Sequence, residues 1–480
     1  MCHKHWAAAG RTDETSQPHR KKPRTLTRRH LLWASGILAG GAVATAAGGV
    51  SAYYGTRFPA GENHSGWLAI RGATALTGEN LEPVTNAIVL VQHGQIVEVG
   101  SRLEIPDGAE ILDAPGATVL PGLIEMHAHL LFPEIDPDDG AEIGAAGHLW
   151  DIVRYMPGVR RDFLEHGITA VRDLGGDLAW ARDLRSSIDD GTLEGPRAFV
   201  AGPLVTTPGG HPIGTVEGGV PEEVVRTPRN PQGAQQVIAE LCDHEDPVDV
   251  IKVVHDSGGA DMSLTAHEPE VLEALVEAAD ERGVPVTAHC GSPTELRQAV
   301  EAGFDGIEHL TLRDRSFDFD QMDHTAAMAW PEGLVDEMAA GGVALDPTLL
   351  VELGYPEDRS PERQELAERR FERLLEAHGA GVQIVAGSDA GMAIPGFGDG
   401  LIGEVMMLGE AGLPTRDVLR AATSQAAAAL RSDRIGVLEA GRAADLLIVD
   451  GDPVADLRAL HEVMAVLRDG RVVVGDIDSV

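Results

Sequence analysis

The chain has 480 residues, of which 43% are hydrophobic. That is enough for one large domain and a smaller one, and it argues against global disorder. The formal net charge is −38, and residues 53–480 are more acidic still, because eight basic side chains but only two acids lie in residues 1–52. Such a surface repels phosphate backbones, so nucleic acid is not an expected partner.

The N-terminal 52 residues have the features of an export signal. Thr27-Arg-Arg-His-Leu-Leu32 precedes the charge-free stretch Leu31–Tyr54, and Val50-Ser-Ala52 offers a small-residue cleavage site. This order is typical of a twin-arginine signal, so we expect recognition by that export machinery and a location outside the cytoplasmic membrane or on its outer face. The stretch is also long enough to span a bilayer, which leaves an uncleaved membrane anchor as the alternative. Residues 53–65 are expected to be a polar linker.

Short strand-like runs occupy residues 66–120 and return in residues 429–480. Ala87–Val99 contains a His-Gly turn between two β-rich halves and predicts a hairpin. Ala444–Val449 and Val463–Val474, the latter with a turn at Asp469-Gly470, have the same character. Chain ends commonly lie close together, so both ends are expected to build one small β-sandwich module.

Between these ends, residues 121–428 alternate apolar strand runs with helical segments such as Glu268–Arg282 and Pro361–His378. This α/β pattern predicts a (β/α)8 TIM-type barrel, with a doubly wound open sheet as the alternative topology. The eight expected strands are Val119–Met126, Ile168–Asp173, Ala198–Gly202, Val248–Val254, Val284–His289, Gly306–His309, Val343–Pro347 and Gln383–Ala386.

Several predicted strands end in residues that bind metals. His127 and His129 are spaced i, i+2, which directs both rings to one side of a strand. By itself this pair is equally compatible with ordinary polar residues. His289 and His309 end predicted strands as well, however, Asp389 follows another, and strand ends meet on one face of a barrel. Imidazole and carboxylate groups suit a divalent metal, so the sequence predicts a metal site there.

Lys252 is the only lysine after Lys22 in a body that otherwise uses arginine. A desolvated lysine amine can become neutral and add carbon dioxide, which gives a carbamate able to bridge two metal ions. The alternative is a single lysine paired with an acid.

The chain resembles the amidohydrolase superfamily, in the branch of imidazolonepropionase-like enzymes and Xaa-Pro dipeptidases. The resemblance covers nearly everything after residue 66 and rests on Pro121-Gly-Leu-Ile-Glu-Met-His-Ala-His129, Gly167-Ile-Thr-Ala-Val-Arg-Asp-Leu-Gly-Gly176, Asp249-Val-Ile-Lys252, Ala288-His289, Ile307-Glu-His309, Ala386-Gly-Ser-Asp389 and Gly441-Arg-Ala-Ala-Asp-Leu-Leu-Ile-Val449. It implies that His127, His129 and Asp389 bind one metal ion, that His289 and His309 bind a second, and that carbamylated Lys252 bridges both. The chain departs from the family at Glu125, where Asp is usual.

The resemblance implies a binuclear hydrolase that attacks an amide through a metal-bridged hydroxide, and the N-terminal signal implies that this hydrolase is exported. Zinc is the expected metal, with manganese or cobalt not excluded by the ligand types. Asp389 would carry the proton to the leaving amine. A dipeptide or N-acyl amino acid is the expected substrate. Alternatives are a lactone, a cyclic amide or a phosphotriester in the same site, or a non-catalytic exported binding protein. A mononuclear deaminase is disfavoured, because Lys252 provides a bridge for a second ion.

Expected substrate contacts are His211, in a glycine-rich loop that follows the third strand, and more weakly His255. A loop-stabilising role for His211 is the alternative. His148 and His166 are expected to be ordinary polar residues. A Cys242–Cys290 disulfide and a homo-oligomer are left open by the sequence.

Overall fold

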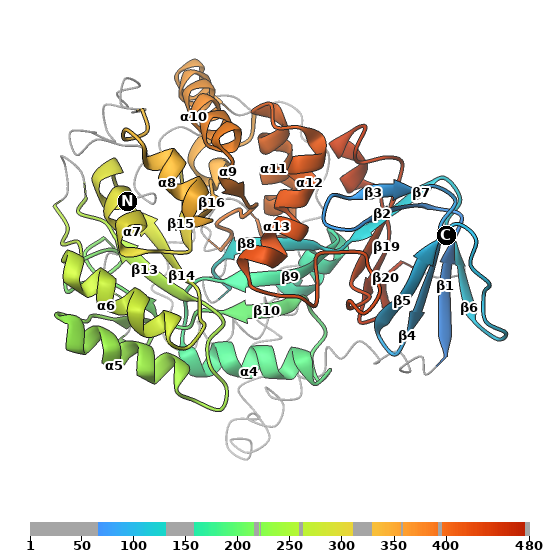
Figure 1. The fold of residues 1–480 in the computed structure, drawn as a ribbon, viewed down its shortest axis with the longest axis horizontal. Coiled ribbons are helices and arrows are strands. Elements are labelled where there is room, and N and C mark those ends of the chain that lie inside the picture. The colour runs from blue at the N-terminus through green and yellow to red at the C-terminus, as the bar shows by residue number, and fades with distance from the viewer. Residues whose placement is uncertain are drawn as a thin grey trace, which may run out of the picture.

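The computed structural model describes residues 66–130, 158–215, 220, 222–258, 263–310, 329–356, 359–391 and 396–475. These residues form a barrel with a β-sandwich at its side (Figure 1). The expected signal, the linker and His148 lie outside the described residues. Within the described ranges, no helix combines the length and the apolar character needed to cross a membrane.

The barrel consists of eight parallel strands. The strands β8, β9 and β10 form one run of the wall, and β13 to β17 continue it together with the short strands β11 (Leu204–Val205) and β12 (Val225–Arg226). Backbone hydrogen bonds close both seams, from Met126 N to Ala386 O at 3.1 Å and from Asp249 N to Val200 O at 2.9 Å. The predicted closed barrel is therefore confirmed, and the open sheet is not formed. The eight strands are β8 (Leu123–Ala128), β9 (Ile168–Asp173), β10 (Arg197–Val200), β13 (Ile251–His255), β14 (Val286–Cys290), β15 (Gly306–Glu308), β16 (Ala344–Asp346) and β17 (Gln383–Ile384).

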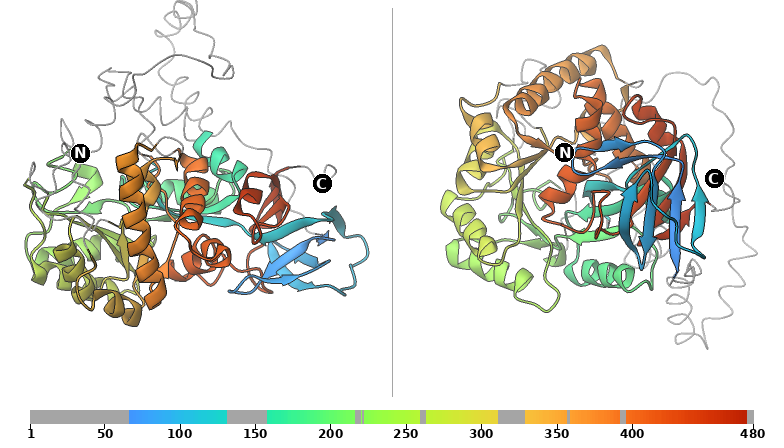
Figure 2. Two further views of the ribbon diagram at one scale, coloured as in Figure 1. Left: turned by 90° about the horizontal axis from the view of Figure 1, so that it is seen from above. Right: turned by 45° about the vertical axis from the view of Figure 1, so that its right-hand side comes forward.

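Helices surround this wall (Figure 2). The predicted helices at 268–282 and 361–378 are confirmed as α6 and α10, with ends shifted by a few residues. Helix α10 shows why the segment is helical, since Ser360 caps its start, Pro361 opens its first turn, and Gly381 ends it at a φ of 93°. The helices are α4 (Leu178–Asp189), α5 (Pro231–Cys242), α6 (Pro269–Asp280), α7 (Pro293–Ala302), α8 (Leu334–Gly341), α9 (Leu349–Leu353), α10 (Pro361–Ala380), α11 (Phe397–Glu410), α12 (Thr415–Ala421) and α13 (Ser424–Ala429).

The β-sandwich combines strands from both ends of the chain, as predicted. Ile70, Val119 and Ile448 are among the buried residues between its two sheets. The expected hairpins are confirmed as β4–β5 and β19–β20. One sheet has the order β5-β4-β1-β6 and the other β20-β19-β18-β7-β2-β3. The strands are β1 (Trp67–Arg71), β2 (Thr74–Thr77), β3 (Glu82–Val84), β4 (Ile88–Gln92), β5 (Gln95–Gly100), β6 (Glu110–Asp113), β7 (Ala117–Pro121), β18 (Leu446–Asp450), β19 (Val463–Arg468) and β20 (Arg471–Val474).

One strand prediction was wrong. The run Val119–Met126 is not a single strand, because β7 ends in the sandwich at Pro121 and β8 begins in the barrel at Leu123. Gly122 separates them. A Cβ at Gly122 would lie 2.7 Å from Thr169 Cβ, so the backbone needs glycine where it passes from one body to the other.

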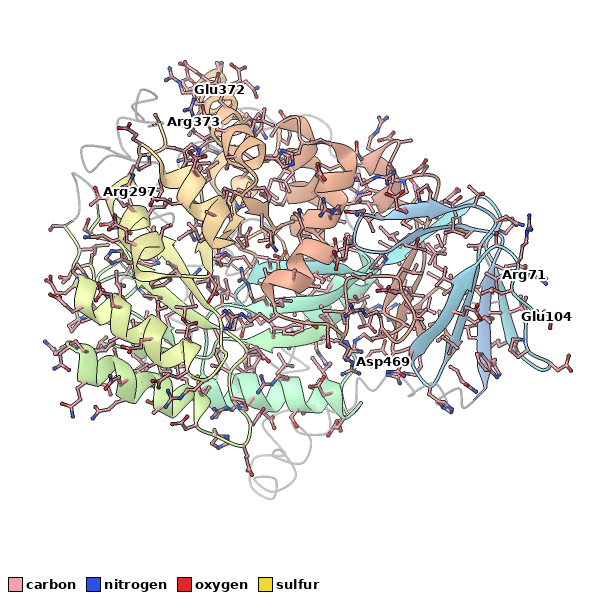
Figure 3. All side chains as sticks on the ribbon, viewed as in Figure 1. Arg71, Glu104, Arg297, Glu372, Arg373 and Asp469 are labelled. Carbon is pink, nitrogen blue, oxygen red and sulfur yellow. The ribbon has the colours of Figure 1, made fainter. Side chains whose placement is uncertain are left out.

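A group of buried and partly buried charges joins the barrel to the sandwich. Arg197, at the start of β10, places its Nε 2.6 Å from Asp445 Oδ2 and also pairs with Asp469. Figure 3 shows Asp469 where the two bodies meet. Burial makes such pairs costly to break, so they hold the sandwich in a fixed place against the barrel.

Candidate active site

The first group of predicted metal ligands meets at the carboxyl ends of β8 and β17. His127 lies near the end of β8, His129 follows that strand, and Asp389 lies beyond β17. Asp389 Oδ1 is 3.4 Å from His127 Nε2 and 3.2 Å from His129 Nε2. Three donor atoms at such spacing could hold one metal ion.

Lys252 reaches the same place from β13. Its Nζ lies 3.3 Å from His127 Nε2, and the side chain is buried. Burial lowers the pKa of Lys252, against the opposing effect of Glu308 and Asp389. The environment therefore favours a neutral amine, the form that can react with carbon dioxide.

His309 and His289 extend the cluster along β15 and β14. The ring centroid of His309 is 5.0 Å from that of His127 and 4.7 Å from that of His289. Burial holds the pKa of His309 well below its ordinary value and lowers the pKa of His127 to about 4. Both rings are thus neutral near pH 7, as metal ligands must be. The donor set of imidazole nitrogens, a carboxylate and a lysine suits divalent ions such as Zn²⁺.

The Asp389 carboxylate is held ionised within this cluster. Burial alone would raise its pKa, but His127, His129 and Lys252 outweigh that effect and lower the pKa to about 2. The backbone of Asp389 has a φ of 59°, in the left-handed region that non-glycine residues seldom adopt. Strain of this kind is common where a side chain must be aimed at a functional site.

Charged residues on the Nδ1 side of the His127 ring fix its orientation. Glu308 Oε2 lies 2.9 Å from His127 Nδ1, and Glu308 Oε1 accepts hydrogen bonds from Arg172 at 2.7 Å and from Thr287 at 2.5 Å. His127 therefore carries its proton on Nδ1 and presents the free Nε2 to Lys252 and Asp389. Asp346 Oδ2 lies 3.7 Å from Arg172. His127, Glu308 and Asp346 also lie close enough to share an ion, but the guanidinium of Arg172 already supplies the positive charge there.

Sequence reasoning gave no role to Arg172, Glu308 or Asp346. One sequence signal could have found them. Each is a charged residue inside an apolar strand run, and a charged side chain in such a place is buried only when it has a partner of opposite charge.

Glu125 connects the end of β8, which carries His127, to the loop that carries Asp389. Its Oε1 accepts the backbone N–H groups of His127 at 2.8 Å and Ser388 at 2.9 Å, and its Oε2 accepts the hydroxyl of Ser388 at 2.6 Å. Burial raises the pKa of Glu125 to about 7, although these bonds oppose the rise. The departure from Asp at this position is thus accommodated by direct contacts to His127 and to Ser388, the neighbour of Asp389.

His211 lies beside the cluster. Its ring stacks on that of His289 with centroids 5.5 Å apart, and its Nδ1 is 2.6 Å from Thr215 Oγ1. Burial, followed by the effect of His289, lowers the pKa of His211 to about 3. The contact to Thr215 fits the loop-stabilising alternative, and the position next to His289 fits a substrate contact, which stays a prediction.

His255 does not fit the substrate contact expected of it. The residue is fully buried, its Nε2 is 2.9 Å from Gln298 Oε1, and its Nδ1 accepts the backbone N–H of His267 at 3.2 Å. Both ring nitrogens are bound within the protein, so neither is left for a substrate. His255 lies three residues after Lys252 on the same strand. Side chains alternate between the two faces of a strand, so the ring of His255 points away from the site.

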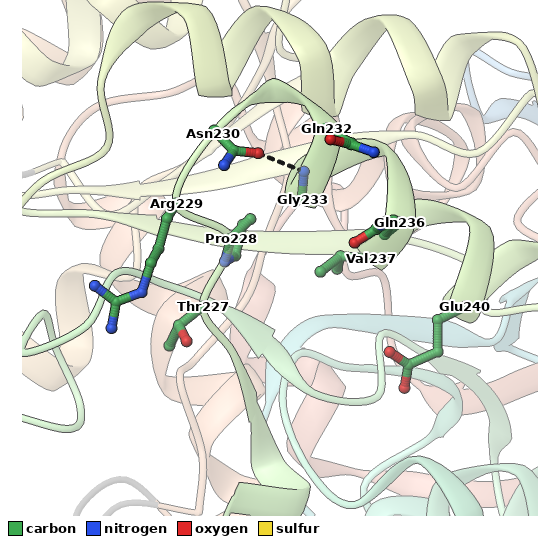
Figure 4. Close-up of a pocket in the computed structure, with 9 residues that line it drawn as sticks. All are labelled: Thr227, Pro228, Arg229, Asn230, Gln232, Gly233, Gln236, Val237 and Glu240. Atoms are coloured by element: carbon green, nitrogen blue, oxygen red, sulfur yellow. Dashed lines mark hydrogen bonds between the residues drawn. The ribbon is translucent and has the colours of Figure 1, made fainter.

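The remaining predictions concern residues away from the cluster. His166 Nδ1 lies 2.8 Å from Asp162 O, as an ordinary polar residue would. Cys242 and Cys290 are not joined by a disulfide in this structure. A separate groove lies between residues 227–230 and α5, where Asn230 Oδ1 accepts Gly233 N at 2.9 Å (Figure 4). None of the predicted site residues lines it.

Residues 118–475 match the sequence profile described as the amidohydrolase family. The chain belongs to the amidohydrolase family. A curated relative of this amidohydrolase, ochratoxinase from Aspergillus niger, is 24% identical over 423 residues, which cover 80% of this chain and 82% of the relative. The expected enzyme class, a hydrolase acting on amide bonds, is confirmed.

Solved structures resemble this amidohydrolase over most of its length. A putative prolidase from Bifidobacterium longum has a TM-score of 0.68 and 27% identity, covering 85% of this chain and 95% of that one. A prolidase complexed with N-methylphosphonate-L-proline has a TM-score of 0.68 and 25% identity, covering 85% of this chain and 100% of that one.

Proposed function

We propose that this amidohydrolase is an exported, binuclear metal-dependent hydrolase that cleaves the amide bond of a dipeptide or N-acyl amino acid, in the manner of a prolidase. The observation that carries the proposal is the position of Lys252. It is buried, with Nζ 3.3 Å from His127 Nε2, at the point where the imidazole and carboxylate donors meet. The resemblance of the barrel to solved prolidases supports the choice of substrate.

The residues divide between two ion sites. His127, His129 and Asp389 would hold one ion, His289 and His309 the other, and the carbamate of Lys252 would bridge them. When bound, two divalent ions, zinc by donor type, supply Lewis acidity to the substrate carbonyl and lower the pKa of a water.

Asp389 is the proposed proton carrier. With a pKa of about 2 it is ionised across neutral pH, so one carboxylate oxygen can accept the proton of the attacking water and deliver it to the leaving amine. The left-handed backbone of Asp389 and the clamp of Glu125 on neighbouring Ser388 hold that carboxylate in place.

His211 is the proposed substrate contact. Thr215 Oγ1 donates to Pro212 O at 3.2 Å, so it accepts the proton of His211 Nδ1 and leaves Nε2 as an acceptor. A neutral ring with a free acceptor nitrogen suits a substrate N–H better than a carboxylate.

A substrate panel tests the proposed reaction. Zinc-loaded enzyme is offered Xaa-Pro and other dipeptides, N-acyl amino acids, cyclic amides, lactones and phosphotriesters. We expect turnover of dipeptides or N-acyl amino acids, its loss on chelation, and its loss in Asp389→Asn. Turnover confined to lactones, cyclic amides or phosphotriesters would replace the proposal with its alternative, and no turnover with bound metal would favour a binding protein.

Export is tested separately. Replacing Arg28 and Arg29 together with lysine should keep the full-length precursor in the cytoplasm, because the twin-arginine pair is the recognised signal. Unchanged export of the double variant would contradict this part of the proposal.

A further inference from the structure

The end of β16 and the loop that follows it contact His309 and the next residue, Leu310, at three points. His309 N donates to Asp346 O at 2.8 Å, and Leu310 N donates to Pro347 O at 3.1 Å. Thr348 Oγ1 lies 2.7 Å from His309 Nδ1. The direction of the His309 ring therefore depends on the conformation of this loop, and above all on Thr348.

Thr348 is an unusual residue in two respects. Its φ is 43°, a left-handed value that a β-branched residue adopts only when its surroundings impose it. It is also the N-cap of α9, yet its side chain makes no capping bond to that helix. A threonine at this position normally satisfies the first N–H groups of its own helix. Here the hydroxyl is turned to His309 instead.

Glu404 of α11 takes over the missing cap. Its Oε1 accepts Leu349 N at 2.9 Å, and its Oε2 accepts Leu350 N at 2.8 Å. The side chain is fully buried. These two N–H groups are the ones that begin α9, and a buried helix start needs acceptors for them. Because Glu404 provides both, the hydroxyl of Thr348 is released for His309.

We propose that Glu404 is a positioning residue for the metal centre. By capping α9 from a separate helix, it holds Thr348 in the left-handed conformation in which Thr348 Oγ1 accepts the Nδ1 proton of His309 and leaves His309 Nε2 free to bind an ion. The inference rests on the proposed function, since it assigns His309 to the second ion. Partners that orient a ligating histidine in this way commonly affect metal affinity without touching the metal.

The test compares Glu404→Gln with Glu352→Gln. The amide that Glu404→Gln introduces offers one acceptor oxygen instead of two, so one N–H of α9 loses its partner. Glu352 lies on the same helix and pairs with Arg370 at 3.2 Å, so its variant perturbs α9 away from Thr348. Thr348→Val removes the hydroxyl, and Thr348→Ser restores it.

The first readout is the affinity of metal-free protein for zinc, measured by competition with a chelator. In Glu404→Gln and Thr348→Val we expect the second ion to bind about 10- to 100-fold more weakly, with the first ion little changed. Glu352→Gln and Thr348→Ser should bind both ions like the unmodified protein. Unchanged affinity for both ions in folded Glu404→Gln and Thr348→Val would overturn the proposal.

The second readout needs no metal. In histidine-labelled, metal-free protein, the ring ¹⁵N signals of His309 should report a proton on Nδ1, and in Glu404→Gln and Thr348→Val a mixture of tautomers. An unmodified protein that binds fewer than two ions would refute the proposed function. The role of Glu404 would still be tested, because the His309 signals are measured without metal. If Glu404→Gln fails to fold, Glu404→Asp takes its place, because the aspartate is too short to reach both N–H groups. It should also weaken binding of the second ion and give a mixture of His309 tautomers. If neither change occurs, Glu404 is not a positioning residue.

Discussion

Lys252 Nζ lies 3.3 Å from His127 Nε2, although the two residues are 125 positions apart in the chain. Lys252→Arg tests why a lysine stands there. A guanidinium stays protonated and cannot form a carbamate, so we expect activity to fall to background while the thermal unfolding curve stays close to that of the unmodified protein. Full activity of this variant would refute the carbamate role.

A label distinguishes the carbamate from a simple ion pair. Incubation with ¹³C-bicarbonate and zinc should give a carbamate carbon signal in the unmodified protein and none in Lys252→Arg. If the two proteins give identical spectra, Lys252 is a lysine paired with an acid, the alternative that the sequence left open.

Glu308→Gln should weaken the site without removing a ligand. The change leaves Arg172 without its 2.7 Å carboxylate partner and removes the negative charge that lies 2.9 Å from His127 Nδ1. We expect metal affinity to fall about 10- to 100-fold and the free energy of unfolding to fall by about 3–5 kcal/mol, as when one partner of a buried ion pair is lost. Thr287→Val is the control. It removes one hydrogen bond to Glu308 but leaves both charges, so an equal loss of metal affinity in the control would contradict this account.

Gly387→Ala should disturb the loop that carries Asp389. A Cβ at Gly387 would lie 2.7 Å from His127 Cβ and 2.8 Å from His127 N. Overpacking of this kind costs about 1–3 kcal/mol, and we expect most of the metal affinity to be lost as the loop moves. Gly379→Ala is the matched change on α10, where an added Cβ meets no atom within 4 Å. It should raise the free energy of unfolding by about 0.5–1 kcal/mol. Normal metal binding by Gly387→Ala would show that the contact is not needed.

His267 should make the protein sensitive to acid. Burial, followed by the charge of His255, lowers the pKa of His267 from 6.5 to about 4. The unfolded chain therefore takes up a proton below about pH 6.5 that the folded protein resists until about pH 4, and stability is lost over that range as pH falls. The loss is at most about 3 kcal/mol. His267→Gln should flatten the dependence of the unfolding midpoint on pH between 7 and 4. Parallel curves for His267→Gln and the unmodified protein would contradict the assignment.

The alternation of strands and helices was enough to predict the closed barrel, because period and spacing are local properties of the chain. The switch at Gly122 was missed, although Pro121-Gly122 is a pair that commonly interrupts a strand, and the approach of Thr169 explains why a glycine is needed there. The hairpin turns at His93-Gly94 and Asp469-Gly470 were predictable, because their left-handed residues lie between β-rich runs.

The site divides in the same way. His127, His129, His289, His309 and Asp389 could be placed together, because each lies near or just beyond the end of a strand and parallel strand ends meet on one face of a barrel. The residues that orient them could not be recognised. Arg172 and Glu308 sit inside strands, and Glu404 sits in a helix, so their roles depend on which neighbours tertiary folding brings to them. His255 shows the converse error, since its closeness to Lys252 in sequence does not bring it to the site.

The central claim is that four histidines, Lys252 and Asp389 form one centre for two ions. It is tested most directly by the metal content of purified protein after loading with zinc and removal of excess ions. We expect about two ions per chain in the unmodified protein and about one in His289→Ala, because each ion has its own histidines while sharing Lys252. An unmodified protein that retains one ion or none would contradict the account.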